Sequence, residues 1–261
     1  MTHLLSFNVI ESGLRCTVKF TEKTTREAFL PLVEIILNDF FLHPACPYCL
    51  AVSGPPGSGK STISAVFQHF FIKKMINTFV LPLDGFHMKN EDLKKKTTYI
   101  AGNPVSLYDI KGAKETYDTE NLFICMDLLK SGKNFFWPVY SRNTHNPVEK
   151  GIYVERKKAI YIIEGNYLFL DRAPWNKLNS YFNRKIFISS SEHFLKKRII
   201  KRKKAGGFSG REALRHYKMS DRRNISEVLK CSKGYDYLLE QEKDYEYKLV
   251  HFQPVHKASY P

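Results

Sequence analysis

The chain has 261 residues, long enough for one large domain or two small ones with a substantial buried core. Its hydrophobic fraction of 43% excludes a mainly disordered chain, and its five cysteines are too few for a disulfide scaffold. No apolar stretch has the length or continuity of a membrane span, and the N-terminal residues do not follow a signal-peptide pattern. We therefore expect a cytoplasmic protein with no membrane partner.

The charge of the chain is strongly positive and unevenly distributed. With 41 Lys and Arg against 26 Asp and Glu, the formal net charge is +15. Residues 184–223 alone carry 14 Lys or Arg and three acidic residues. Such a concentrated positive field predicts an anionic ligand, which could be nucleic acid, nucleotide phosphates or a membrane surface. Composition alone leaves these alternatives open.

The N-terminal part of the sequence predicts a β-hairpin followed by a helix. Two runs of β-forming residues, 4–10 and 14–20, flank a short turn that contains glycine. Thr21 is a predicted N-cap, and the apolar residues that follow have helical spacing as far as His43. We expect residues 1–48 to form an extension that packs on the main domain of residues 49–261.

Apolar runs and amphipathic segments alternate along the main part of the chain. The predicted strands are 50–52, 78–83, 159–163 and 185–188. The predicted helices are 63–71, 120–130 with Thr119 as its cap, 192–204, 211–217 and 224–229. Because continuous apolar strands separated by helices are typical of a parallel sheet covered on both faces, we predict an α/β fold.

A glycine-rich segment follows the first of these strands. Residues 54–61 match the pattern G-x-x-x-x-G-K-[ST] in full, between a predicted strand and a predicted helix. In such a loop, backbone N–H groups surround phosphate oxygens, the lysine reaches the β- and γ-phosphates, and the serine hydroxyl binds Mg²⁺. The predicted nucleotide-binding residues are Gly54, Gly57, Ser58, Gly59, Lys60, Ser61 and Thr62. Lys60 is also a predicted catalytic residue and Ser61 a predicted metal ligand.

Two carboxylates are predicted at the same edge of the sheet as this loop. Asp84 ends the strand 78–83, and Gly85 indicates a sharp turn that exposes it. There it could accept a proton from an attacking hydroxyl or orient Mg²⁺ through water, although an Asx-turn is the structural alternative. Glu164 follows the strand 159–163, where a carboxylate needs a cation such as Mg²⁺ or Lys60. Its structural alternative is a pair with an arginine.

Several strings spread over residues 50–225 resemble those of one enzyme group. They are residues 54–62, 84–87, 111–118, 138–142 and 164–168, with Asp221 and Asn224. The sequence resembles the P-loop kinases of the phosphoribulokinase, uridine kinase and bacterial pantothenate kinase superfamily. It is most similar to the pantothenate-kinase-like branch, which includes fructose-transport-system and nucleoside kinases. The resemblance implies a P-loop NTPase-type sheet with a helical lid, ATP and Mg²⁺ as cofactors, Asp84 as catalytic base and Glu164 near Mg²⁺.

The basic segment falls where such a kinase carries its lid. Arg198 and Arg202 lie four residues apart on one helix face, so both could reach one anionic ligand and stabilise charge in phosphoryl transfer. Glycines at 206, 207 and 210 could serve as hinges for a lid near residues 196–211. The alternative is a solvated basic face, which would account for many of the lysines.

The binding site for the phosphoryl acceptor is less well defined by the sequence. The predicted acceptor-binding residues are His87, Tyr117, Asp118, Tyr140 and Arg142. The aromatic rings could form walls, and the arginine could hold a carboxylate or a polar group. Lys114 stands where the resembled pattern has proline. The acceptor stays open among sugars, nucleosides and pantothenate-like acids.

We therefore predict an ATP- and Mg²⁺-dependent kinase that phosphorylates a hydroxyl of a small metabolite. One alternative is a nucleic-acid-associated NTPase that uses residues 184–223, although the sequence has no recognisable nucleic-acid-binding module. Another is a regulator that binds nucleotide without catalysis. A homodimer is compatible with the sequence. Cys46 and Cys49 match a redox dithiol string but precede a buried strand rather than a helix, which disfavours redox chemistry.

Overall fold

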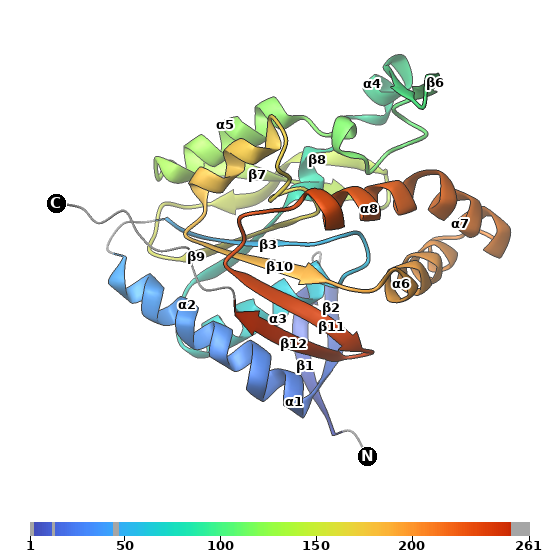
Figure 1. The fold of residues 1–261 in the computed structure, drawn as a ribbon. Helices are drawn as coiled ribbons and strands as arrows, with labels where there is room; N and C mark the ends of the chain where they lie inside the picture. The colour runs from blue at the N-terminus through green and yellow to red at the C-terminus, as the bar shows by residue number, and fades with distance from the viewer. Residues whose placement is uncertain (1–2, 12–13, 44–46, 252–261) are drawn as a thin grey trace.

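The structure is a computed structural model that describes residues 3–11, 14–43 and 47–251. Within this part of the chain, the largest sheet has six strands in the order β12-β11-β10-β3-β9-β4 (Figure 1). The strands are β3 (Tyr48–Ser53), β4 (Thr78–Pro82), β9 (Ile160–Gly165), β10 (Arg184–Ser189), β11 (Tyr237–Lys243) and β12 (Glu246–His251). All neighbouring strands pair in parallel except β11 and β12, which are antiparallel. This confirms the predicted α/β fold with a mostly parallel sheet.

Helices cover both faces of this sheet because its central strands are apolar on both sides. All six residues of β3 are buried, with Leu50 and Val52 in the hydrophobic core of one face and Ala51 in that of the other. The helices α2 (Leu30–Leu42) and α3 (Lys60–Lys73) cover the first face, and α5 (Thr119–Lys130) covers the second (Figure 1). Burial on both sides explains why these strands lack polar alternation in the sequence.

The N-terminal extension packs on the first face. The hairpin β1 (Leu4–Glu11) and β2 (Leu14–Thr21) leads into a continuous helical segment, formed by α1 (Glu22–Thr24), a π-helical turn and α2. The Thr21 side chain accepts a hydrogen bond from the Thr24 N–H, so its prediction as an N-cap is confirmed. Phe29 packs against Phe67 of α3 with ring centroids 5.6 Å apart. The extension therefore shares the core that supports α3.

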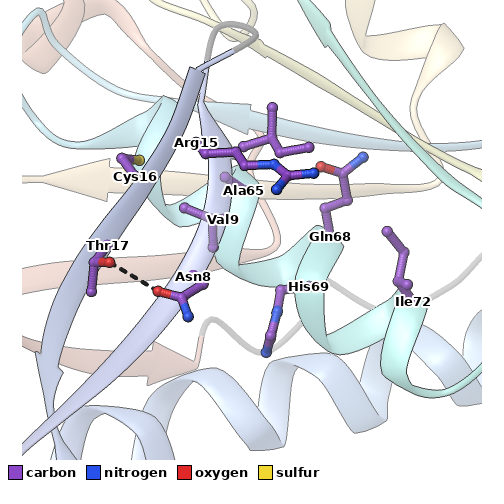
Figure 2. A pocket seen from close by; sticks show the side chains of 10 residues that line it. Asn8, Val9, Arg15, Cys16, Thr17, Ala65, Gln68, His69 and Ile72 are labelled. Atoms are coloured by element: carbon purple, nitrogen blue, oxygen red, sulfur yellow. Dashed lines mark hydrogen bonds between the residues drawn. The ribbon is translucent and has the colours of Figure 1, made fainter.

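The hairpin does not close fully against α3. A cavity of about 560 Å³ lies between them, and Figure 2 shows residues that line it, among them Asn8, Arg15, Gln68 and His69. The Thr17 hydroxyl donates a hydrogen bond to the Asn8 side-chain oxygen across the hairpin (2.9 Å). Apolar side chains such as Val9, Ile10, Ala65 and Ile72 also line the cavity, so this border of the extension is mixed in polarity.

The basic segment forms helices beside the carboxyl end of the sheet. These are α6 (Glu192–Ala205), α7 (Gly210–His216) and, after a π-helical turn, α8 (Arg222–Cys231) (Figure 1). Leu195 and Ile199 of α6 are buried with Tyr217 and Ile225, which gives these helices a small core of their own. Each of the three predicted helices is present, with ends that differ from the prediction by a few residues.

Several elements were not predicted from the sequence. They are the hairpins β5–β6 (Thr97–Ile100, Asn103–Ser106), β7–β8 (Phe135–Ser141, Asn146–Val154) and β11–β12, and the short helix α4 (Asn90–Lys95). Prolines at 104, 138 and 147 lie inside these strands, and β11 ends in charged residues, so the usual strand signal is weak. The predicted Thr119 cap was wrong, because the Asp118 side chain caps α5 instead.

None of the described helices combines the length and apolar character required to cross a membrane. Of the two cysteines in the dithiol string, Cys46 lies outside the described residues. Cys49 is buried within β3.

Candidate active site

The phosphate-binding loop joins the end of β3 to the start of α3, as its sequence context predicts. Gly57 and Gly59 have φ angles of +82° and +91°, a backbone conformation that favours glycine because a Cβ atom would be strained there. The helix α3 begins at Lys60, directly after Gly59. The loop therefore ends at a helix N-terminus, whose free N–H groups and partial positive charge favour an anion.

Lys60 is almost fully buried at this helix start. It is 8% exposed, and its ammonium group donates a hydrogen bond to the Pro55 carbonyl across the loop (3.1 Å). Burial lowers the pKa of Lys60, while the nearby charges of Glu164 and Asp84 act in the opposite direction. The three groups thus lie within electrostatic reach of one another, and the lysine charge is compensated by two carboxylates.

Glu164 comes from the neighbouring strand. The parallel register of β3 and β9 places Glu164 beside Val52, near the point where β3 enters the loop. It lies within β9 rather than after it, and its carboxylate accepts a hydrogen bond from the Ser61 hydroxyl (3.0 Å). Burial raises the pKa of Glu164, repulsion from Asp84 adds to the increase, and Lys60 opposes it. Glu164 is therefore hydrogen-bonded to Ser61, and the charge of Lys60 also acts on its carboxylate.

The pair of Ser61 and Glu164 fits a Mg²⁺ site in which the phosphates of a nucleotide and water supply the other ligands. No group of three or more His, Cys, Asp or Glu side chains among the described residues could hold a metal ion by itself. Mg²⁺ in nucleotide sites is usually held by one or two protein oxygens, several waters and the phosphates of the substrate. A serine hydroxyl bonded to a buried carboxylate therefore suits Mg²⁺ bound together with a nucleotide.

Asp84 lies just beyond the end of β4. This strand ends at Pro82, and Leu83–Phe86 form a 3-10 turn that contains the aspartate. The Asp84 side chain is 58% exposed, accepts a hydrogen bond from the Tyr117 hydroxyl (3.3 Å) and lies 4.0 Å from the His87 Nε2 atom. The carboxylate is thus oriented by an aromatic hydroxyl while it stays open to solvent, an arrangement suited to a group that receives a proton from a substrate.

A cavity of about 530 Å³ lies beside this turn, and His87 and Tyr117 form part of its wall. Their rings are 4.0 Å apart between centroids, and burial lowers the pKa of His87. The cavity is also lined by Gly85, Met88, Lys89, Asp92, Lys96, Asp118, Asn121, Pro138 and Glu149 among others. Asp84 itself does not line the cavity, but its chain neighbour Gly85 and its hydrogen-bond partner Tyr117 do. The mixed polar and aromatic lining is of the kind that binds small polar metabolites.

Two of the predicted acceptor-binding residues, Tyr140 and Arg142, do not line this cavity. Arg142 is exposed in the turn between β7 and β8 and does not line the cavity. Tyr140 is half-buried, with its ring against His87 (5.5 Å between centroids) and the Lys111 ammonium over its face (5.0 Å), and it also lies outside the lining. Asp118 lines the cavity while its side chain caps α5. Of the predicted residues, His87, Tyr117 and Asp118 line the cavity, and Tyr140 contacts the His87 ring.

Lys114, which stands where the resembled kinase pattern has proline, forms ion pairs in the structure. The Lys114 ammonium pairs with the carboxylates of Glu115 (2.8 Å) and Glu227 (2.7 Å), and the latter belongs to α8. Lys114 therefore links the segment that carries Tyr117 to α8, the last helix formed by the basic segment.

The two arginines of α6 differ in their contacts. Arg198 donates hydrogen bonds to the Gly57 carbonyl and to the Tyr247 hydroxyl, both 3.3 Å away, and thus lies against the phosphate-binding loop. Arg202 is exposed, but its charge lowers the pKa of Lys60, so it is near the same site. The expected pair on one helix face therefore faces the loop, with one member bound to the loop and the other open to solvent.

Two residues near the loop were missed by the sequence reasoning. Glu11, at the tip of the N-terminal hairpin, accepts a hydrogen bond from the Thr62 hydroxyl (2.9 Å). Tyr247, on β12, donates a hydrogen bond to the Ser58 carbonyl (3.2 Å). Each is far from the loop in the sequence and belongs to no motif. No local signal could have found them.

The fold and the loop define a P-loop protein of the nucleoside- and metabolite-kinase type. The pattern of the phosphoribulokinase / uridine kinase family matches residues 49–228, and the chain belongs to this family. It is 29% identical over 238 residues to the uncharacterized protein YggC of Escherichia coli, covering 90% of this chain and 95% of that protein. It is 26% identical over 199 residues to a pantothenate kinase of Enterococcus faecalis, covering 69% of this chain and 62% of that enzyme.

Among solved structures, the chain is similar to a candidate fructose transport system kinase from Silicibacter sp. TM1040. The TM-score is 0.70 at 27% identity, and the match covers 81% of this chain and 97% of that one. The family and this similarity confirm the resemblance that the sequence motifs indicate.

Proposed function

We propose that the protein transfers the γ-phosphoryl group of ATP to a hydroxyl group of a small metabolite, with Mg²⁺ bound at Ser61 and Glu164. The observation that carries this proposal is the placement of three charged residues at one edge of the sheet. Lys60 begins α3 after the loop that follows β3, Glu164 lies in the adjacent strand β9, and Asp84 follows β4, which pairs with β9. The loop that precedes Lys60 has the geometry of a phosphate site, and a cavity lined by Gly85, His87 and Tyr117 lies near the turn that carries Asp84. Membership of a kinase family supports the same reaction class.

In the proposed reaction, the acceptor hydroxyl oxygen forms a bond to the γ-phosphorus while the bond from phosphorus to the bridging oxygen of ADP breaks. The hydroxyl proton passes to the Asp84 carboxylate, which the Tyr117 hydroxyl orients. Lys60 and Arg198 stabilise the charge on the phosphate oxygens, and Arg202 can join them when the helices of residues 196–211 close as a lid. Mg²⁺ supplies further neutralisation of the phosphates when bound.

The domain arrangement that we propose keeps residues 49–261 as the kinase domain and residues 1–48 as its extension. The acceptor would lie in the cavity bordered by His87, Tyr117 and Asp118. Pantothenate and uridine are acceptors named for members or relatives of the family, and both present primary hydroxyl groups of small, polar molecules.

The alternative of a nucleic-acid-binding NTPase is weakened by the contacts of the basic segment. Several of its cations are engaged within the protein: Arg184 with Asp39, Lys203 with Asp221, Arg222 with Glu192, and Arg223 with Glu115. Arg198 is bound to the phosphate-binding loop. Part of the positive charge therefore has a local structural role.

The decisive experiment is a screen for Mg²⁺-dependent ATP consumption over a library of sugars, nucleosides and pantothenate-like acids. With the acceptor found, Asp84→Asn is expected to lower kcat by about 10²–10⁴-fold, because the base is lost while the side chain keeps its shape. The affinity for Mg²⁺-ATP should stay within about twofold of the wild-type value, since Asp84 lies on the acceptor side. Full activity of the variant would remove Asp84 from the proposed role. A wild-type protein that binds ATP but consumes none with any acceptor would favour a regulator.

A further inference from the structure

Tyr247 lies behind the phosphate-binding loop, although it is more than 180 residues away in the sequence. It belongs to β12 and is 5% exposed. Its hydroxyl donates a hydrogen bond to the Ser58 carbonyl (3.2 Å) and accepts one from the Arg198 guanidinium (3.3 Å). A Cβ atom at Gly59 would lie 3.2 Å from the same hydroxyl, so the tyrosine and the loop are in close contact.

These hydrogen bonds fix the orientation of a peptide group in the loop. Because a trans peptide is planar, the Gly59 N–H points opposite to the Ser58 carbonyl and therefore away from Tyr247. A phosphate-binding loop requires its N–H groups to point towards the anion and its carbonyls to point away from it. By accepting a hydrogen bond from Tyr247, the Ser58 carbonyl is held on the side where it cannot repel a phosphate oxygen.

The N-terminal extension in turn holds Tyr247 in place. The Tyr247 N–H donates a hydrogen bond to the Thr24 hydroxyl oxygen (2.7 Å), and that hydroxyl donates one to the Tyr247 carbonyl (3.3 Å). The Tyr247 ring also packs against Phe20 and Phe29, with centroids 5.9 and 6.4 Å apart. The tyrosine is thus fixed at its backbone and its ring, which leaves its hydroxyl in a defined position at the loop.

We propose that Tyr247 is a positioning residue for the phosphate-binding loop, and that the N-terminal extension seats it there. It holds the Ser58–Gly59 peptide ready for the nucleotide phosphates and keeps Arg198 beside the loop. This inference rests on the proposed nucleotide site, and it assigns a role to an extension that the family motifs do not cover, since the matched segment begins at residue 49.

The test is the variant Tyr247→Phe, which removes the hydroxyl and keeps the ring in its packing. Binding of Mg²⁺ with a non-hydrolysable ATP analogue is measured by calorimetry on the full chain, together with melting curves with and without this ligand. Loss of a hydrogen bond that prepares the loop should weaken binding about 5- to 10-fold, and the ligand should raise the Tm less than in the wild-type protein. Tyr245→Phe is the matched control, since Tyr245 is half exposed on the same hairpin.

The outcomes separate a positioning role from a purely structural one. If Tyr247 only stabilised the fold, the variant would melt at a lower temperature without ligand and would still bind the nucleotide with wild-type affinity, and this result would overturn the inference. Failure of the wild-type protein itself to bind the nucleotide would overturn the proposed function as well. Thr24→Val provides a second variant should Tyr247→Phe not fold, with an expected loss of affinity of about 2- to 5-fold and the same contrary result.

Discussion

The phosphate side and the acceptor side of the candidate site are built in different ways. On the phosphate side, Lys60 and Ser61 lie at the start of α3, directly after the loop, and Glu164 lies in the adjacent strand β9. Lys60 and Glu164 are each only 8% exposed. On the acceptor side, the cavity wall comes from five separate parts of the chain between residues 85 and 149, and the Asp84 carboxylate is mainly exposed.

The two sides of the site therefore depend on the fold in different ways. The phosphate side depends on backbone geometry and on electrostatics within a buried cluster, so one short motif can specify it. The acceptor side depends on how loops and hairpins pack on one another, and such loops can change in sequence without loss of the sheet. A family can therefore share phosphate chemistry while its members differ in acceptor.

The largest effect on the acceptor side is expected for Gly85→Ala. A Cβ atom at Gly85 would lie 1.9 Å from the Pro138 carbonyl oxygen of β7, so the turn after β4 and the β7–β8 hairpin would have to separate. We expect a loss of about 3 kcal/mol in the free energy of unfolding. Activity with the acceptor should fall more than nucleotide affinity does. Denaturant unfolding and separate measurement of the two KM values check this.

Gly206→Ala is the control for this change, because a Cβ atom there would meet its nearest backbone oxygen at 3.4 Å, an ordinary contact. Equal stability of the Gly85 variant and the wild-type protein would show that β7 does not press against the turn as described.

On the phosphate side, Glu164→Gln should change how stability depends on pH. The native pKa of Glu164 is raised above its ordinary value of 4.5, so the folded state binds this proton more tightly than the unfolded state does. The stability from Glu164 is therefore fully present below pH 4.5 and is lost as the pH rises through the native pKa. Glutamine does not titrate, so the variant should gain about 1–2 kcal/mol relative to the wild-type protein between pH 4.5 and about pH 8.

Melting curves of the two proteins without nucleotide, recorded at several pH values, measure this difference. Loss of the Glu164 charge also lowers the pKa of Lys60, so the comparison is made at acidic pH, where Lys60 is protonated in both proteins. A difference in stability that is constant with pH would mean that the carboxyl titrates at its ordinary pKa. The same variant should lose Mg²⁺-dependent activity, which would show that the buried carboxylate is kept for function at a cost in stability.

The smallest effect is expected for Arg142→Ala. Because this residue is exposed in the β7–β8 turn and does not line the cavity, the KM for the acceptor should stay within about twofold of the wild-type value. Steady-state kinetics with the acceptor from the screen measures it. A tenfold increase in KM would place the arginine against the bound acceptor, as the sequence pattern suggests, and would require the hairpin to move on binding.

The sequence by itself determined the parts of the protein that depend on local patterns. The apolar runs predicted four strands of the central sheet, helical periodicity predicted the main helices, and the motif at residues 54–61 predicted the loop that ends at α3. The order of strands and helices also predicted that Asp84 and Glu164 would emerge at the edge that carries Lys60. These features follow from spacing within short stretches of chain, where local geometry decides the outcome.

Only the tertiary structure decided which distant residues meet. The contact of Tyr247 with Ser58, that of Glu11 with Thr62, and the position of Arg142 outside the cavity depend on how the hairpins β11–β12, β1–β2 and β7–β8 pack on the rest of the protein. The physical reason is that such contacts join segments far apart in the chain, so no local periodicity encodes them. The contact of Tyr247 with Ser58, for example, is fixed by the core that the N-terminal extension and β12 share, in which Phe20, Phe29 and Tyr247 pack together.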